Sequence, residues 1–219
     1  MISTRDLSSM PTIEALRKLT QALAMLDAIM MPEWDYRYYS FNSKWADAEQ
    51  MASMRNGEGD AWFCGFGLQG AFLKGFDHES EMSPWSMQVP KVWPGVLDTV
   101  PEDFRSFATE PAFSMNDTTF CIWRSFRDSE WKVGKITYPS GDDPDGSAWM
   151  LSLLDDRPAS YRAFAESYYE RSVSLPAVQR IYEHAPLTAE LVKELNAAVD
   201  LKSVMNDAAE IDYPIVSCS

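Results

Sequence analysis

A histidine surrounded by carboxylates is the first group in this sequence whose residue types suggest chemistry. His78 lies in the segment "FDHESE" beside three acids, Asp77, Glu79 and Glu81. A carboxylate that orients an imidazole makes a general base, and an imidazole with one or two acids can ligate a metal. The paired histidines of a zinc helix are absent, because the residue four positions after His78 is Met82. We therefore favour a polar turn without metal, and keep a hydrolase or metal-dependent enzyme centred on His78 as the alternative.

A second acidic segment, "GDDPDGS", places Asp142, Asp143 and Asp145 together. A calcium loop needs alternating acids and a closing glutamate at its twelfth position. Counted from Asp143 that position is Leu154, which has no oxygen to offer. The segment is therefore predicted to be an acidic turn ahead of a helix, with carboxylates suited to contact the arginine or lysine of a partner.

Nucleophiles are few, and their surroundings are apolar. Cys64 and Cys121 each lie within an apolar strand pattern, where a thiol is usually an inert small hydrophobe; the alternative is an inter-strand disulfide. The serines stand in neither a G-x-S-x-G nor an S-x-x-K motif. We therefore expect no catalytic residue, no cofactor and no enzymatic activity.

The glycines around Cys64 raise the question of a phosphate-binding loop, because "GFGLQG" matches the letters of G-x-G-x-x-G. A dinucleotide site needs that motif to open a helix. Here the flanking runs "DAWFCGF" and "GAFLKGF" have strand length, and another glycine and a turn follow soon. The stretch is therefore predicted to be a β-hairpin with glycines at its turn.

Aromatic residues dominate the segment "WDYRYYSFNSKW". Neighbouring side chains of a strand point to opposite faces. If Trp34, Tyr36 and Tyr38 point inward, the three residues between and after them point to solvent, namely Asp35, Arg37 and Tyr39. The alternative is a strand buried on both faces. Tyrosine, tryptophan and arginine are frequent anchors of protein interfaces, so the outward set is a candidate partner surface.

The elements that must position these residues follow from periodicity and capping. Apolar spacing predicts a helix over 12–30 with Thr12 as its cap, a strand over 33–41, and a helix over 43–56. Two hairpins follow, over 60–76 and over 118–139, and a helix begins at Pro101. After the loop "SGDDPDGS" the pattern is helical, over 148–156, 161–172, 177–185 and 188–199, and residues 210–216 form a terminal strand or tail.

These elements predict an α+β fold, with an antiparallel sheet built from two hairpins, an N-terminal helix and a C-terminal helical part. We expect one domain over 1–219, with a possible division into a sheet-containing part, 1–140, and a helical part, 146–210. The longest apolar helical stretch is interrupted by Asp27 and is too short to cross a bilayer. With no secretory signal and sparse cysteines, the chain is expected to be cytoplasmic and free of the membrane.

Charge narrows the class of partner. The chain has 33 acidic and 19 basic residues, a net charge of −14. Nucleic acid would be repelled, whereas a basic protein would be attracted. The alternative is that the charge serves solubility.

The segments "WDYRYYSFNSKW", "MASMRNGEGD", "GAFLKGFDHES" and "WPGVLDTVP" resemble a family of uncharacterised bacterial proteins. In its small size, acidity and aromatic content the chain also resembles immunity proteins, which neutralise bacterial toxins, often nucleases. That resemblance implies tight binding to a toxin domain without catalysis.

The favoured function is thus a non-enzymatic binding protein whose acidic surface covers the basic surface of a toxin. The third hypothesis, after the enzyme, is a regulatory or scaffold domain. The residues expected to contact a partner are Asp35, Arg37, Tyr39, Asp77, Glu79, Asp142, Asp143 and Asp145.

Overall fold

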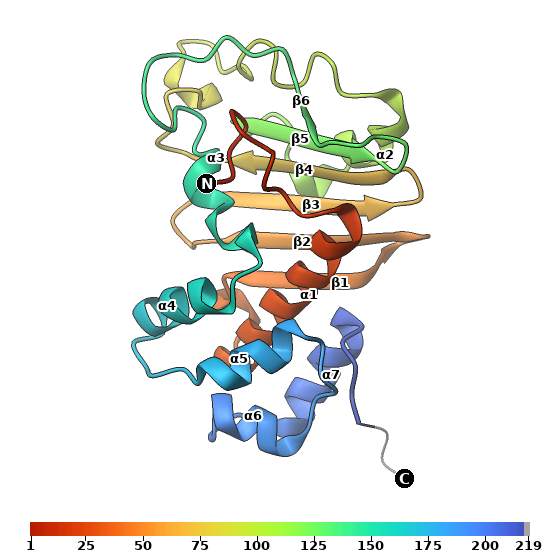
Figure 1. Ribbon diagram of the computed structural model, residues 1–219. Helices are drawn as coiled ribbons and strands as arrows, with labels where there is room; N and C mark the ends of the chain where they lie inside the picture. Colours follow the sequence, from red (N-terminus) through yellow and green to blue (C-terminus); the bar gives the residue numbers. More distant parts are fainter. Residues whose placement is uncertain (217–219) are drawn as a thin grey trace.

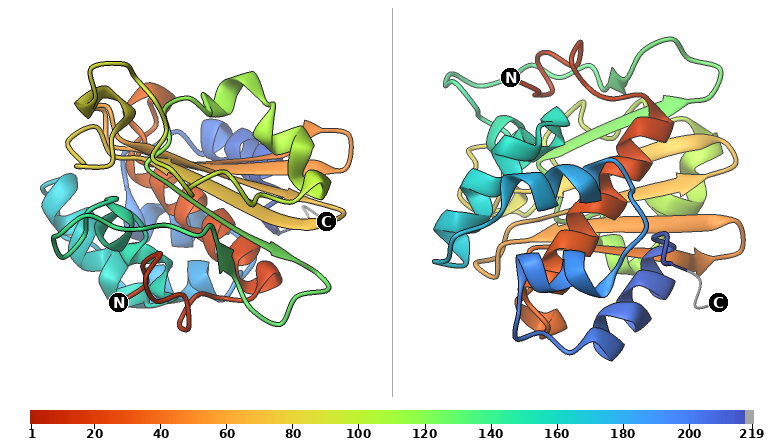
Figure 2. Two further views of the ribbon diagram at one scale, coloured as in Figure 1. Left: turned by 90° about the horizontal axis from the view of Figure 1, so that it is seen from above. Right: turned by 60° about the horizontal axis from the view of Figure 1, so that its bottom comes forward.

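The computed structural model describes residues 1–216, which form three layers (Figure 1). The middle layer is an antiparallel sheet in which, over the described residues, six strands follow one another in chain order. Helix α1 (Ile13–Met30) and the C-terminal helices cover one face, and residues 77–119 cover the other; Figure 2 shows α1 and that segment on opposite sides of the sheet. The α+β fold with an N-terminal helix, an antiparallel sheet and a helical C-terminal part is confirmed.

Each strand pairs with the next one in the chain, so successive turns alternate between the two ends of the sheet. The strands are β1 (Tyr39–Ala46), β2 (Glu49–Arg55), β3 (Ala61–Gly67), β4 (Gly70–Phe76), β5 (Phe120–Ser125) and β6 (Lys132–Val133). We call the end that holds residues 47–48 and 68–69 the Leu68 end, and the end that holds residues 56–60 and 77 the Asp60 end.

The β1–β2 hairpin replaces the helix predicted over residues 43–56, which was wrong. Met51 faces one side of the sheet, and Ala52 and Met54 belong to the core on its other side. A central strand buried on both faces has no polar alternation, so its apolar residues also fit a helical period. Ala48 turns the chain with a positive φ of 56°.

The glycine-bearing stretch is the predicted hairpin. Gly67 pairs with Gly70 across the Leu68-Gln69 turn, and no helix follows the turn. On β3, a Cβ at Gly65 would lie 2.4 Å from the Phe107 ring, so a glycine is needed for that ring to pack on the sheet. The second predicted hairpin is shorter than expected, because β6 keeps only Lys132–Val133.

Helix α1 confirms the expected capping and burial. The Thr12 hydroxyl accepts a hydrogen bond from the Ala15 amide, and the helix ends at Met30, shortly before Pro32. The last two turns of α1 are buried on all sides, since helices of the C-terminal part cover the side away from the sheet. Among the described residues, no helix is both long and apolar enough to cross a bilayer.

Short helical segments and an aromatic cluster cover the other face of the sheet. Phe104 and Phe107 are buried there, and their rings pack near Phe72 and Phe113. The segments are η2 (Pro84–Ser86), η3 (Glu102–Phe104), α2 (Arg105–Ala108) and η4 (Pro111–Phe113).

The last third of the chain is helical, as predicted, and the side chains of Ser174 and Thr188 cap two of its helices. Its segments are α3 (Ser147–Met150), η5 (Ser152–Asp155), α4 (Pro158–Tyr168), α5 (Leu175–Tyr182), α6 (Ala189–Leu195) and α7 (Leu201–Ile211). Helix α7, capped by Asp200, was not predicted. Residues 210 and 211, the start of the predicted terminal strand or tail, belong to this helix. In the rest of that segment, Ile215 forms an isolated β-bridge with Leu187.

Candidate functional site

An acidic pocket opens at the Asp60 end of the sheet, where two loops far apart in the sequence meet. Residues 77–81 follow β4, and residues 140–144 precede α3. The pocket has a volume of about 320 Å³, and six carboxylate side chains line it among the described residues: Asp60, Asp77, Glu79, Glu81, Asp142 and Asp143. The described residues that line it include no lysine or arginine. Four of the predicted contacts therefore lie in one pocket: Asp77, Glu79, Asp142 and Asp143.

Asp60, which lines this pocket, forms a hydrogen-bonded pair with His78. Asp60 is 6% exposed, and its Oδ1 lies 2.7 Å from His78 Nδ1 and accepts the His78 amide at 2.8 Å. Asn56 Nδ2 donates to the other oxygen at 2.6 Å. The hydrogen bond to Asp60 raises the pKa of His78. The histidine thus belongs to a tight turn, as expected, and is also paired with a buried acid that the sequence analysis did not single out.

Asp77 ties the first loop to α3, the helix that follows the second loop. Its Oδ1 accepts the amides of Glu79 and Ser80, and its Oδ2 accepts the indole N–H of Trp149 at 2.8 Å. A Cβ at Gly146 would lie 2.2 Å from that Oδ2, and the glycine has a φ of 75°. A side chain at position 146 would therefore displace Asp77 and strain the backbone.

The second loop is held from both sides. The Asp143 carboxylate accepts the Ala148 and Trp149 amides at the start of α3. Arg5 donates to the carbonyls of Gly141 and Asp142 at 2.8 and 3.2 Å. Because this guanidinium bonds to backbone oxygens, the Asp142 carboxylate stays exposed, as do those of Glu79 and Glu81 on the other loop.

Three of the residues expected to contact a partner are buried, and for Arg37 and Tyr39 the predicted outward orientation was wrong. Asp145 is 1% exposed and bonds to Thr4 and Ser147. Arg37 and Tyr39 point inward, the reverse of the expected alternation. Asp35 is exposed as expected, but it lies in a helical turn and not in a strand.

The expected strand over 33–41 divides into η1 (Trp34–Tyr36) and β1, which begins at Tyr39. Arg37, in extended conformation, and a bend at Tyr38 join the two segments. Strand alternation therefore does not run unbroken from Trp34 to Tyr39, and it cannot predict the face of each side chain. As a result Trp34 and Tyr36 are the exposed aromatic residues within this segment, at 50% and 69% exposure.

Three side chains near the acidic pocket have the residue types and the proximity of a metal site. Asp60, Asp77 and His78 offer atoms that lie within 4.8 Å of one another. However, each of the four oxygens of the two carboxylates already accepts a hydrogen bond, from Asn56, His78, the 79–80 amides or Trp149. A cation would have to displace these donors, so the geometry favours a support for the loops.

The cysteines at positions 64 and 121 are free and fully buried, as predicted. Burial raises the pKa of both thiols well above the ordinary range, which makes the reactive thiolate scarce. Lys74 is also buried: its Nζ donates to the Asp117 carbonyl at 2.6 Å, and burial lowers its pKa to about 8. No pocket described for residues 1–216 is lined by these three residues.

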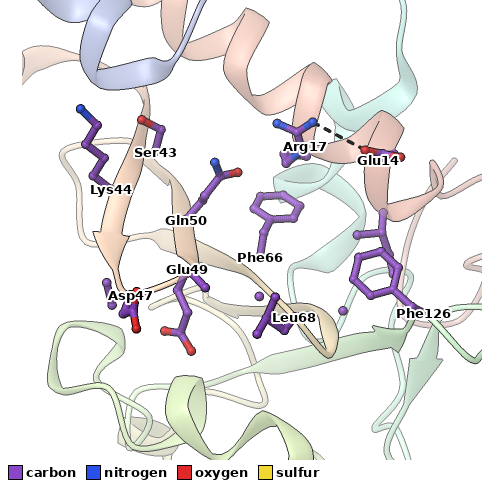
Figure 3. A pocket seen from close by; sticks show the side chains of 15 residues that line it. Glu14, Arg17, Ser43, Lys44, Asp47, Glu49, Gln50, Phe66, Leu68 and Phe126 are labelled. Atoms are coloured by element: carbon purple, nitrogen blue, oxygen red, sulfur yellow. Dashed lines mark ion pairs between the residues drawn. The ribbon is translucent and has the colours of Figure 1, made fainter.

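A larger groove, of about 520 Å³, lies at the Leu68 end (Figure 3). The Phe66 ring lies at its centre, and Leu68 and Phe126 flank it. Charges of both signs surround this apolar strip, among them the Arg17–Glu14 ion pair at 3.7 Å. With lysine and arginine beside glutamate and aspartate, the groove lacks the one-sided charge of the acidic pocket.

Comparison with protein-family models, with curated proteins and with solved structures gives no match for this chain. The resemblances to uncharacterised bacterial proteins and to immunity proteins therefore stay predictions.

Proposed function

We propose that this chain is a non-enzymatic binding protein that captures a basic protein partner at its acidic pocket. The observation that carries the proposal is the meeting of two loops whose carboxylates face one hollow without a lysine or arginine in its described lining. The net charge of the whole chain, −14, has the same sign as the pocket. Such a field attracts a cationic partner from a distance and speeds its association.

Among binding proteins, the proposal favours an immunity protein that covers the basic surface of a toxin, for example a nuclease. A protein that binds nucleic acid must itself be basic, and an acidic pocket is complementary to it. The proposal places the chain in the cytoplasm, where the free thiols Cys64 and Cys121 stay reduced.

The test compares two sets of charge-neutralising substitutions. Glu79→Gln, Glu81→Gln and Asp142→Asn remove exposed carboxylates from the pocket, and the matched control neutralises Asp103, Glu130 and Glu183, which lie outside it. Partners are the purified products of the genes that flank the chain's own gene, measured by calorimetry. We expect a saturable complex that the pocket variant weakens at least about tenfold and the control weakens far less.

Equal weakening of binding by the two variants would show that the partner is attracted by the net charge alone and does not bind at the acidic pocket. If no flanking gene product binds and cationic peptides do not bind either, the proposal loses its basis.

The Asp60–His78 pair supports a second candidate, an enzyme centred on His78, because a buried carboxylate orients the imidazole. Metal retained in stoichiometric amount, or a hydrolytic activity abolished by His78→Ala, would favour the enzyme. A regulatory or scaffold domain would instead be indicated by stable association with a housekeeping complex.

A further inference from the structure

The helical turn η1 presents two large aromatic side chains to solvent. Trp34 and Tyr36 are 50% and 69% exposed, although most tryptophans of a folded chain are largely buried. Adjacent exposed aromatic residues are typical of protein interfaces, where they supply contact area at a low cost in side-chain entropy.

This segment is held rigidly from beneath by Arg37. The guanidinium donates to the carbonyls of Met31 and Pro32, each at 2.8 Å, and to both oxygens of Asp207 at 2.9 Å. Arg37 is 8% exposed, and these bonds tie the segment that carries η1 to the end of α1 and to α7. Trp34 is thus displayed by a fixed backbone, so a partner would not have to order it.

The surroundings of η1 indicate which side chains it would accept. The Arg55 guanidinium lies over the Trp34 ring, 4.1 Å from its centroid, and leaves half of the side chain exposed. Glu33 and Asp35, on either side of Trp34 in the sequence, are exposed carboxylates. Aromatic faces beside carboxylates suit arginine, whose planar guanidinium stacks and pairs at the same time.

Close contacts connect η1 to the acidic pocket. Arg55 is the last residue of β2, and the turn over residues 56–60 follows it directly. Asp60 in that turn bonds to His78, and the residue that precedes His78, Asp77, bonds to Trp149 at the pocket. The aromatic turn and the pocket therefore lie on the same end of the sheet, with Arg55 and the turn between them.

We propose that Trp34 and Tyr36 bind an arginine-bearing segment of the basic partner while the acidic pocket holds further cationic side chains of it. This inference rests on the proposed function, because it assumes a cationic polypeptide. It adds the chemistry of the recognised segment, arginine in preference to lysine, and the residues that slow its release.

The experiment uses deca-arginine and deca-lysine as probes, with calorimetry at low ionic strength. In a Trp34→Ala/Tyr36→Ala variant we expect deca-arginine to bind about fivefold more weakly, and deca-lysine about twofold at most. The pocket variant described above should weaken both peptides. In nitrogen-15 spectra, the indole signal of Trp34, assigned with Trp34→Phe, should shift on adding deca-arginine.

The matched control is Leu68→Ala/Phe126→Ala, which removes exposed apolar side chains at the opposite end of the sheet. It should bind both peptides as the parent does. Unchanged deca-arginine binding by the Trp34/Tyr36 variant, or an equal loss in the control, would overturn the inference and leave the acidic pocket standing. If the parent binds neither peptide, the inference is overturned; if no flanking gene product binds either, the proposed function is contradicted as well.

Discussion

Asp27 shows how one residue can join three elements of this molecule. It lies on α1, is fully buried, and accepts hydrogen bonds from the Tyr39 amide on β1 and the Tyr161 hydroxyl on α4, both at 2.7 Å. Burial raises its pKa from 3.8 to about 6, although these hydrogen bonds oppose the shift. In the sequence Asp27 is only an interruption of an apolar stretch; in the fold it is a buried connection.

The raised pKa predicts a pH dependence of stability. Since the folded state holds the Asp27 proton more tightly than the unfolded state, its contribution is full below about pH 4 and is lost as pH rises through about 6. We expect the free energy of unfolding of the parent, relative to Asp27→Asn, to fall by about 2 kcal/mol between pH 4 and pH 7. Urea denaturation across that range measures it, and a difference that does not vary with pH would contradict the shift.

At the scale of elements, the packing of residues 77–119 on the sheet depends on Gly65, which has no side chain. Phe107 lies against β3 where Gly65 leaves room, and its ring stacks with Phe72 and Phe113. A strand glycine that lacks a turn or a positive φ is explained here by the close approach of an aromatic ring.

Gly65→Ala is therefore expected to lower the free energy of unfolding by about 1–3 kcal/mol, because the new methyl group displaces the Phe107 ring. Chemical denaturation measures the loss. In a Phe107→Leu background the same change should cost clearly less, since the two positions are coupled. Additive costs would show that the ring is not the obstacle.

At the scale of the whole molecule, α1 packs against both the sheet and the C-terminal helices. It packs on β1 and β2 and also against α5, α6 and α7. One continuous apolar cluster accordingly includes residues of the sheet, such as Trp62 and Ile122, and of the helical part, such as Val178 and Val204. A helical part separated at residue 146 would expose one side of α1.

This arrangement predicts one cooperative unfolding transition for the chain. Tryptophan fluorescence, which reports mainly on the sheet layers, and far-ultraviolet circular dichroism, which reports on the helices, should change at the same urea concentration. A fragment of residues 1–140 is expected to lack a cooperative transition. Two separate transitions in the full chain would indicate two domains.

Local pattern was enough for much of the fold. The Thr12 cap and apolar stripe of α1, the hairpin over 61–76, the apolar strand β5 and the caps at Ser174 and Thr188 are all short-range signals. Such elements follow from periodicity and from the hydrogen bonds of a few neighbouring residues. Segment 43–56 lacked such a signal, because burial of residues 51–54 on both faces of the sheet erases the alternation that distinguishes a strand.

For the candidate site, too, the sequence predicted local features but not the contacts between distant segments. The sequence by itself determined that carboxylates gather over 77–81 and 142–145, that aromatic residues crowd the start of β1, and that the net charge is strongly negative. Only the tertiary structure decided that the two loops share a pocket, that Asp145 and Arg37 are buried, and that Trp34 is exposed. Residue types fix charge and local hydrogen bonding, whereas the partner of each side chain depends on which distant segments the core brings together.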